Sequence, residues 1–351
     1  MGRAPPPGVD AVTTGVPVPS DRETWLRSAT DWARHHSGCP DLHLEEVVTE
    51  AWSTVWRSTA PAGDLWFKES RSANLAEGRV HDVLAGLAPD QVTAPVAWDN
   101  RRGWLLTRDG GVTVMDSSPS DRGLAGSVAQ DLLADYAQLQ RATIGQRDVL
   151  VSAGLPEGLP HQAEQLLQAC VTEMAALPTD DPRHVSATEA HQLLTDGAQA
   201  VREAGRLLTD GPVPLAFDHN DLFPRNVFLP QGGGNYRFFD FAESLWAHPF
   251  GSLLMLLWEL IRRHRLDVGD SGTIDVSHTP IRAVFDSYLQ EWTEYTALHE
   301  LRQLAGHALQ VAPLYRTSTW LTVLRRNPKA VGDHGSTPRA WIFDVTRPVV
   351  V

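Results

Sequence analysis

Polar side chains occur at a spacing suited to phosphate chemistry in the stretch 217–240. Asp221 is followed five positions later by Asn226, and a second acid, Asp240, ends an apolar strand after a short turn. Carboxylate and amide oxygens are the ligands that Mg²⁺ prefers, and a carboxylate can also orient a hydroxyl that accepts a phosphoryl group. The spacing therefore predicts three oxygen ligands or bases at one sheet edge, the minimum needed to handle a metal-bound phosphate.

A single lysine is the second candidate for chemistry. The chain contains two lysines, Lys68 and Lys329, and otherwise uses arginine for positive charge. A compact ammonium reaches a phosphate as a point charge, whereas a guanidinium prefers planar bidentate partners. Lys68 follows the apolar run 65–67 of an expected strand, and Glu77, early in the next expected helix, is its candidate ion-pair partner. The simpler alternatives are an edge-strand lysine and an acid favoured by the helix dipole.

The order of these residues matches a known arrangement. His219, Asp221 and Asn226 have the spacing H-x-D-x-x-x-x-N of the kinase catalytic loop, and Asp240-Phe241-Ala242 stands where the metal-binding D-F-G would follow. With a strand lysine upstream, the chain resembles the aminoglycoside phosphotransferase family, the kinase-like small-molecule phosphotransferases. The resemblance covers roughly 44–325, most of the chain outside its two ends.

The resemblance implies a two-lobed, protein-kinase-like α+β fold with ATP and Mg²⁺ in the cleft. Asp221 would be the catalytic base, and Asn226 and Asp240 would be the magnesium ligands. Lys68, held by Glu77, would contact the α- and β-phosphates. The implied activity is transfer of the γ-phosphate of ATP to a hydroxyl of a small-molecule acceptor, such as an aminoglycoside or another metabolite.

The catalytic segment differs from the family pattern at positions beside the acids. Asn220 stands where the family usually has glycine, and Phe223 stands where it has a second histidine. By the resemblance, His219 would brace the loop rather than react.

Three further departures leave a second interpretation open. The expected phosphate-covering loop, 49–54, has no glycine, and the Ser53 and Thr54 hydroxyls are candidates to replace backbone contacts to phosphate. Ser252 occupies the position where the family often shows an aspartate that stabilises the catalytic loop, so this loop must be braced otherwise. Ala242 replaces the glycine of protein kinases and carries little weight. The alternative is a catalytically weak or inactive nucleotide-binding scaffold.

Hydrophobic periodicity divides the chain into three parts. Residues 1–20 lack periodicity and are expected to form a disordered tail. A leading amphipathic helix, short strands and one inserted helix in 21–116 predict a small antiparallel-sheet lobe that binds nucleotide. Residues 117–351 are expected to form a mostly helical catalytic and acceptor-binding lobe with a β-hairpin near its middle. Within it, 327–351 has no clear pattern and is expected to be loop-like.

The expected elements can be given by their ranges. Strands are expected at 44–52, 54–58, 64–69, near Val96 and at 103–108, and helices at 21–37, 72–87, around 132–140, and at 160–176, 186–208, 250–264, 280–296 and 299–325. Ser186 and Glu189 have the spacing of a capping box at the start of the helix 186–208.

Composition limits the partners. The net charge of -13 argues against nucleic acid and anionic membranes, and it favours a cationic or neutral acceptor. Two widely spaced cysteines, Cys39 and Cys170, suggest a reducing compartment, and neither a secretion signal nor a span-length apolar run is present. We therefore expect a cytoplasmic protein with no nucleic-acid or membrane partner, while its oligomeric state stays open.

Three other groups of residues in the sequence have types that could serve a function. His35, His36, Cys39 and His43 offer zinc-type ligands, but they lie across a helix end and a loop without a second ligand pair. Gly269-Asp270-Ser271-Gly272 mimics the nucleophile turn of trypsin-like proteases, which are β-barrels, so a solvated turn is favoured. Acidic and aromatic residues of the helical lobe are candidates to line an acceptor pocket: Glu243, Trp246 and Trp258.

Overall fold

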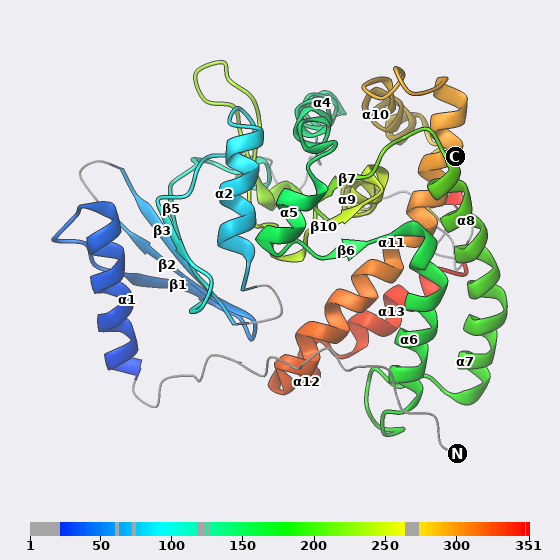
Figure 1. Ribbon diagram of the computed structural model, residues 1–351, viewed down its shortest axis with the longest axis horizontal. Helices are drawn as coiled ribbons and strands as arrows, with labels where there is room; N and C mark the ends of the chain where they lie inside the picture. The colour runs from blue at the N-terminus through cyan, green and yellow to red at the C-terminus, as the bar shows by residue number, and fades with distance from the viewer. Residues whose placement is uncertain are drawn as a thin grey trace.

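The computed structural model describes residues 22–59, 63–71, 75–117, 124, 126–263, 274–347 and 349–351. The expected tail at 1–20 and the 269–272 turn lie outside the described residues. Figure 1 shows a small sheet with its own helices at one end of the molecule and a larger, mainly helical part at the other. This arrangement confirms the expected fold class.

An antiparallel sheet organises the N-terminal part. Its strands are β1 (Glu45–Thr49), β2 (Ser53–Ser58), β3 (Leu65–Ser70), β4 (Ala97–Asp99) and β5 (Trp104–Arg108), in the order β1-β2-β3-β5-β4. Side chains alternate between the two faces of a strand. Phe67 on β3 is therefore buried against helix α1 (Arg22–Ser37), whereas Lys68 faces helix α2 (Glu77–Leu87) on the other side.

Aromatic side chains hold α1 on the outer face of the sheet. The ring centroid of Trp25 lies 4.7 Å from that of Trp56 and 6.2 Å from that of Trp104. Trp32 meets Trp104 at 5.6 Å and Phe67 at 5.9 Å. Such pairs contribute about 0.5–1.5 kcal/mol each beyond their buried area, so α1 is an integral part of this lobe.

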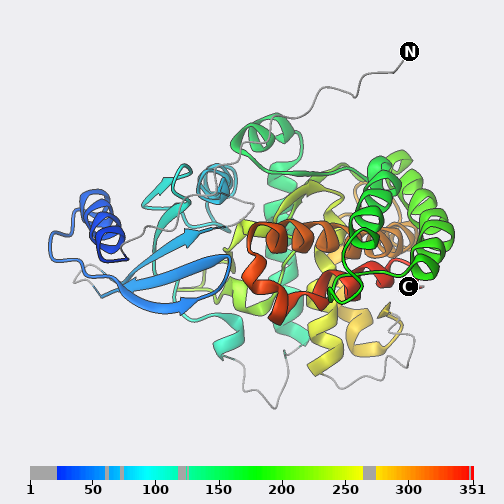
Figure 2. The same ribbon diagram turned by 90° about the horizontal axis from the view of Figure 1, so that it is seen from below.

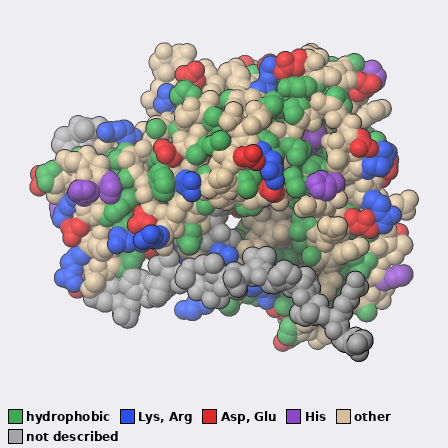
Figure 3. Space-filling view, in the orientation of Figure 1, with side chains coloured by type: hydrophobic (Ala, Val, Ile, Leu, Met, Phe, Trp, Pro, Cys, Tyr) green, Lys and Arg blue, Asp and Glu red, His purple; other side chains and the backbone are tan. Residues whose placement is uncertain are grey.

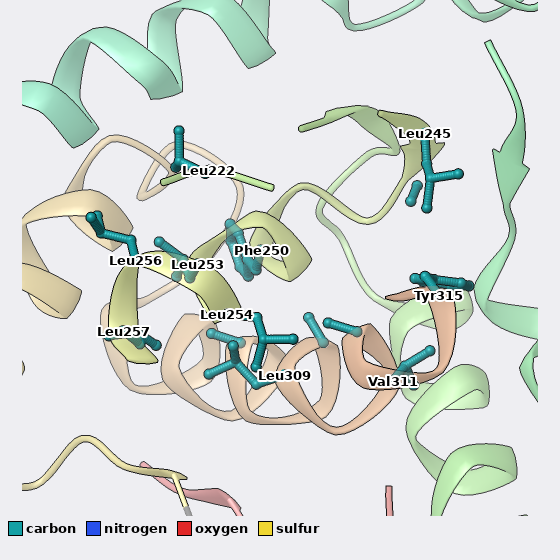
Figure 4. Packing of buried hydrophobic residues seen from close by; sticks show 14 of the residues in the cluster. Leu222, Leu245, Phe250, Leu253, Leu254, Leu256, Leu257, Leu309, Val311 and Tyr315 are labelled. Atoms are coloured by element: carbon teal, nitrogen blue, oxygen red, sulfur yellow. The ribbon is translucent and has the colours of Figure 1, made fainter. Parts of the chain in front are cut away.

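The C-terminal part is built from helices packed around one core. They are α3 (Val114–Ser117), α4 (Gly126–Thr143), α5 (Arg147–Ala153), α6 (Ala163–Ala175), α7 (Ala187–Gln192), α8 (Ala198–Asp210), α9 (Leu253–Arg263), α10 (Thr279–Gln290), α11 (Leu298–Arg326), α12 (Val331–His334) and α13 (Ser336–Asp344). The 29-residue α11 runs through the middle of this part (Figure 2). In Figure 4 Leu254 of α9 lies beside Leu309 of α11, and Leu222, which follows strand β7, belongs to the same buried cluster.

A three-stranded sheet lies at the base of the candidate site. It has the order β6-β10-β7, formed by β6 (Glu157–Gly158), β7 (Ala216–Asp218) and β10 (Leu245–Ala247). The expected hairpin is also present, because β8 (Val227–Phe228) pairs antiparallel with β9 (Arg237–Phe238). The stretch 216–247 thus folds as strand, loop, hairpin and strand, which brings its two ends side by side.

Two expectations about the helices need correction. The segment 327–351 is not loop-like, because it contains a 3₁₀ turn (Pro328–Ala330), α12, α13 and strand β12 (Val349–Val350), which pairs with β11 (Ile274–Asp275). Its helices are too short for periodicity to show. The expected helix 186–208 is divided by a π-helical turn, Leu193–Gly197, between α7 and α8. The predicted capping box at its start is present.

The visible surface mixes charges of both signs. On the face drawn in Figure 3, acidic and basic side chains form small groups among apolar and neutral ones. Exposed ion pairs of the helical part include Arg202–Glu164 and Arg206–Glu203. Within the described ranges, no helix combines the length and apolar character that crossing a bilayer requires.

Candidate active site

Strand β7 delivers the catalytic segment into a left-handed turn. Asn220 has a φ of 58°, a conformation that costs little for glycine and is tolerated by asparagine. Its side-chain Nδ2 donates to the carbonyl of Glu243 at 3.1 Å and to Thr319 Oγ1 at 3.4 Å. A residue tolerant of positive φ is needed here, which explains why asparagine can stand where the family usually has glycine.

Asp221 and Asn226 close the loop on itself. Asn226 Nδ2 donates to both the backbone carbonyl and Oδ2 of Asp221, each at 3.0 Å. A 3₁₀ turn, Pro224–Asn226, supplies the curvature that makes these contacts possible. With Nδ2 committed to Asp221, the carbonyl oxygen of the Asn226 amide is the atom left to meet another ligand.

Two arginines that sequence reasoning missed lie against Asp221. Arg225 Nη2 is 3.1 Å from Oδ2, and Arg316 Nη1 is 3.3 Å from Oδ1. Arg316 projects from α11, is 4% exposed, and also donates to the backbone carbonyl of Asn220. The H-x-D-x-x-x-x-N spacing gives no sign of Arg316, because that residue follows the motif by some 90 positions in a separate helix.

Glu243 shares the Arg316 guanidinium with Asp221. Its Oε2 is 3.4 Å from Arg316 Nη1. Burial raises the pKa of Glu243 to about 7, although the positive charge of Arg316 opposes that shift. Two acids therefore face one buried arginine, and the raised pKa of Glu243 lets its charge change near neutral pH.

Lys68 joins the two lobes. Its Nζ lies 2.9 Å from Glu77 Oε1 on α2 and 2.7 Å from Asp240 Oδ1 after β9. Glu77 is buried and also accepts from Ser70 Oγ at 2.9 Å. The structure thus brings together the lysine and both acids that the sequence pattern selects.

The charges at this junction reinforce one another. Burial would lower the pKa of Lys68, but Asp240 and Glu77 outweigh it and hold the pKa above its ordinary value. Burial would likewise raise the pKa of Asp240, but the adjacent Lys68 ammonium keeps it below the usual range. The Asp240 side chain is 41% exposed, so an ionised carboxylate is open to solvent beside Lys68.

His219 lies behind the reacting groups. Its Nε2 donates to the carbonyl of Phe239 at 3.0 Å, and its ring packs against Phe217 and Phe241. Burial lowers the pKa of His219, which favours the neutral ring. These contacts tie the catalytic segment to the end of the β9 strand.

The expected phosphate loop reaches across to the helical lobe. At its tip, the Trp52 ring centroid lies 5.4 Å from Trp320 of α11 and 4.9 Å from His334 of α12. The hydroxyl of Thr54, a candidate for phosphate contact, is buried and accepts from Thr49 Oγ1 at 3.4 Å. Both ribbon views place α12 and the C-terminal end of α11 next to the strand ends of the sheet (Figures 1 and 2).

The two tryptophans that the sequence suggested for an acceptor pocket, Trp246 and Trp258, lie in different surroundings. Trp246 is buried within β10 as part of the large hydrophobic core. Trp258 lines a cavity of about 540 Å³ between α9 and α13, together with Trp341 and Arg339. Arg316 lies over the Trp341 ring at 5.3 Å, which connects the wall of this cavity to Asp221.

The zinc-type residues do not assemble into a site. The rings of His35 and His36 meet at 5.0 Å, and His36 packs on Trp32 at 4.7 Å. Nowhere in the described ranges do three His, Cys, Asp or Glu side chains gather in a group that could hold a metal ion. His35 and His36 thus make ring contacts on the surface of α1.

Comparison with known proteins identifies the fold. No family model and no curated protein sequence matches the chain. Among solved structures, an ethanolamine kinase from Plasmodium vivax superposes with a TM-score of 0.63 at 10% identity, covering 93% of this chain and 88% of that one. The macrolide 2'-phosphotransferase of Brachybacterium faecium gives 0.52 at 16% identity, covering 92% of this chain and 98% of that one.

A third match extends the group. An aminoglycoside phosphotransferase in complex with GDP and kanamycin gives a TM-score of 0.53 at 12% identity, covering 88% of this chain and 98% of that one. All three are similar to this chain over most of their length. The chain therefore has the kinase-like fold of small-molecule phosphotransferases, and the resemblance noted in the sequence is confirmed at the level of the fold.

Proposed function

We propose that this protein is an ATP-dependent kinase that phosphorylates a hydroxyl group of a small molecule. The observation that carries the proposal is the position of Lys68, which joins Glu77 of the small lobe to Asp240 of the helical lobe. A cation held at this point can meet donor phosphates that enter the cleft, and phosphoryl transfer depends chiefly on such positioning and charge stabilisation.

The roles of the side chains follow from their chemistry. Asp221 would accept the proton of the acceptor hydroxyl as its oxygen bonds to the γ-phosphorus, while the bond from that phosphorus to the bridging oxygen of the β-phosphate breaks and ADP leaves. The amide oxygen of Asn226 and the exposed carboxylate of Asp240 are hard oxygen donors that suit magnesium. When bound, magnesium would neutralise charge on the donor phosphates. Lys68 would exchange one carboxylate contact for a phosphate contact.

Arg316 and Arg225 would orient the base. Arg316 is buried and fixed to the Asn220 carbonyl, so it restrains Asp221 Oδ1 from behind. The Arg225 side chain is 57% exposed, so it can leave Oδ2 when an acceptor hydroxyl approaches. Once Arg225 has left, Oδ2 keeps the hydrogen bond from Asn226 Nδ2 and can accept the proton through its second lone pair, while Oδ1 stays beside Arg316.

The alternative is a nucleotide-binding scaffold with little or no turnover. It is favoured by the glycine-free loop, whose Trp52 docks on the helical lobe and whose Thr54 hydroxyl is buried. Calorimetric titration with ATP, with and without magnesium, separates the two functions. Magnesium-dependent binding together with ADP release supports the kinase, whereas magnesium-independent binding, or none, without ADP release supports the scaffold.

The acceptor is tested by a screen. Coupled ADP release would be followed with ATP or GTP and a panel of amino alcohols, aminoglycosides, macrolides and sugars. The proposal predicts acceptor-dependent release for at least one compound. No stimulation over the background ATPase by any acceptor class would count against it.

A further inference from the structure

A buried carboxylate lies directly before the catalytic loop. Asp218 ends β7 and is 1% exposed. Its Oδ1 accepts from the backbone amide of Asn220 at 2.7 Å. A hydrogen bond of this kind, from an amide two residues later, forms an Asx turn. Asp218 therefore fixes the turn that places Asn220 in its left-handed conformation.

Ser252 connects this carboxylate to a second backbone amide. Its Oγ donates to Asp218 Oδ1 at 2.5 Å and accepts from the amide of His219 at 3.1 Å. Tyr136 of α4 contacts the same Oγ at 2.6 Å and the same His219 amide at 3.0 Å. Two consecutive buried amides, those of His219 and Asn220, are thus satisfied by side chains from three elements.

The backbone around Ser252 is shaped to the carboxylate. A Cβ atom at Gly251 would stand 2.6 Å from Asp218 Oδ2, so only glycine allows this approach. Gln140 also binds both segments through Nε2, which donates to the carbonyls of Phe217 and Pro249 at 2.9 and 2.8 Å. The segments that carry Asp218 and Ser252 are therefore held in fixed register.

We propose that Asp218 and Ser252 form one positioning unit that sets the path of the catalytic loop and hence the direction of Asp221. The proposal rests on the proposed phosphotransfer, because the unit acts on catalysis only through Asp221. The unit also explains how the catalytic loop is held in place although position 252 is a serine instead of an aspartate. The carboxylate comes from the strand, and the helix side supplies a hydroxyl that links it to His219.

This arrangement requires a hydrogen-bond acceptor at position 218 and does not require a negative charge there. Burial raises the pKa of Asp218 to about 7, so the side chain changes charge near neutrality. Oδ1 remains an acceptor in both protonation states when the proton is carried on Oδ2. An asparagine at this position can present the same acceptor, whereas alanine leaves the Asn220 amide buried and unpaired.

The test uses the full-length chain. Asp218→Ala, Ser252→Ala, the double variant and Asp218→Asn are compared with wild type, and Val171→Ala serves as a control for lost core packing in α6. Steady-state kinetics give kcat and the KM for ATP. Hydrogen exchange of the segment 216–226 reports on the loop independently of catalysis.

Each alanine variant should lower kcat about 10-fold or more while the KM for ATP changes little, because misplacement affects the chemical step. The double variant should lower kcat by no more than the more damaging of the two single variants does, since the two residues act as a unit. Asp218→Asn should have a kcat much closer to that of wild type than Asp218→Ala has. Exchange in 216–226 should accelerate in the alanine variants and not in Val171→Ala.

The proposal is overturned if the two alanine effects multiply, or if Val171→Ala lowers kcat equally at a comparable loss of stability. A wild-type protein that transfers no phosphate would refute the proposed function instead. In that case unchanged exchange in Asp218→Ala and Ser252→Ala would still overturn the positioning unit by itself.

Discussion

Lys68 and Asp240 are 172 positions apart in the sequence, yet Nζ and Oδ1 lie 2.7 Å from each other across the two lobes. The same ammonium is held by Glu77 at 2.9 Å. One lysine therefore links the sheet, helix α2 and the metal-type carboxylate. The arrangement makes this side chain the natural point at which donor phosphates would be received.

Replacement of Lys68 should reduce phosphotransfer strongly. Lys68→Met removes the charge but keeps an unbranched side chain, and kcat/KM for ATP is expected to fall about 100-fold or more. Lys329→Met is the matched control, because it removes the only other lysine from an exposed 3₁₀ turn. Equal activity of the two variants would show that Lys68 has no part in the reaction.

Asn220 allows a stability test of the left-handed turn. With φ at 58°, Asn220→Ala should destabilise the protein by about 1–2 kcal/mol more than Asn220→Gly, because a Cβ is strained there. Both variants lose the same side-chain hydrogen bonds, so their difference isolates the backbone. Chemical denaturation measures it. Equal stability of the two variants would contradict the assigned conformation.

The contact of Trp52 with Trp320 and His334 should affect nucleotide binding more than stability. Trp52→Ala frees the tip of the loop, and losing about 0.5–1.5 kcal/mol of aromatic contact should raise the Kd for ATP several-fold. Trp98→Ala is the control, since Trp98 is an exposed aromatic on β4 of the same sheet. Calorimetry that finds the same Kd in both variants would rule out this role for the loop.

His248 should make the protein sensitive to acid. Burial lowers the pKa of His248 to about 3, whereas in the unfolded chain a histidine titrates near pH 6.5. Between these values the unfolded state binds more protons, so stability is lost as the pH falls. His248→Asn keeps an acceptor for the Phe250 amide but does not titrate.

The free energies of unfolding of wild type and His248→Asn, measured from pH 8 to pH 4, test this. The stability of the variant relative to wild type should rise below pH 6.5 by on the order of 1 kcal/mol per pH unit. Parallel curves over the whole range would mean that His248 has the same pKa in the folded and unfolded states, which would contradict the shift caused by its burial.

Local spacing carried most of what the sequence could predict about the site. Asp221 and Asn226 meet because a short loop that ends in a 3₁₀ turn fixes their separation. The two-residue period of a strand places Lys68 on the other face of the sheet from Phe67. The scarcity of lysine gave Lys68 a weight that its strand position alone would not have. The Asp221–Asn226 contact and the face on which Lys68 lies depend on short stretches of chain, so they can be predicted from a local sequence pattern.

Contacts between distant segments could not be predicted in the same way. Arg316 and Tyr136 reach the catalytic segment from two separate helices, and nothing in their local sequence marks them. Ser252 stood out in the sequence as a departure from the family pattern, but its hydrogen bonds to Asp218 and His219 could not be predicted from that position. The α12–α13 region was expected to be loop-like because short helices carry little periodicity. Its helices are held by tertiary packing, and Trp52 meets one of them from the other lobe.

The central claim is that Asp221 acts as the base in phosphoryl transfer, and Asp221→Asn tests it most directly. With an acceptor found by the ADP-release screen, the variant should bind ATP with magnesium as wild type does. Its rate of phosphotransfer should fall about 100-fold or more, since a group needed in the transition state is lost. A variant that phosphorylates the acceptor at close to the wild-type rate would contradict the assignment.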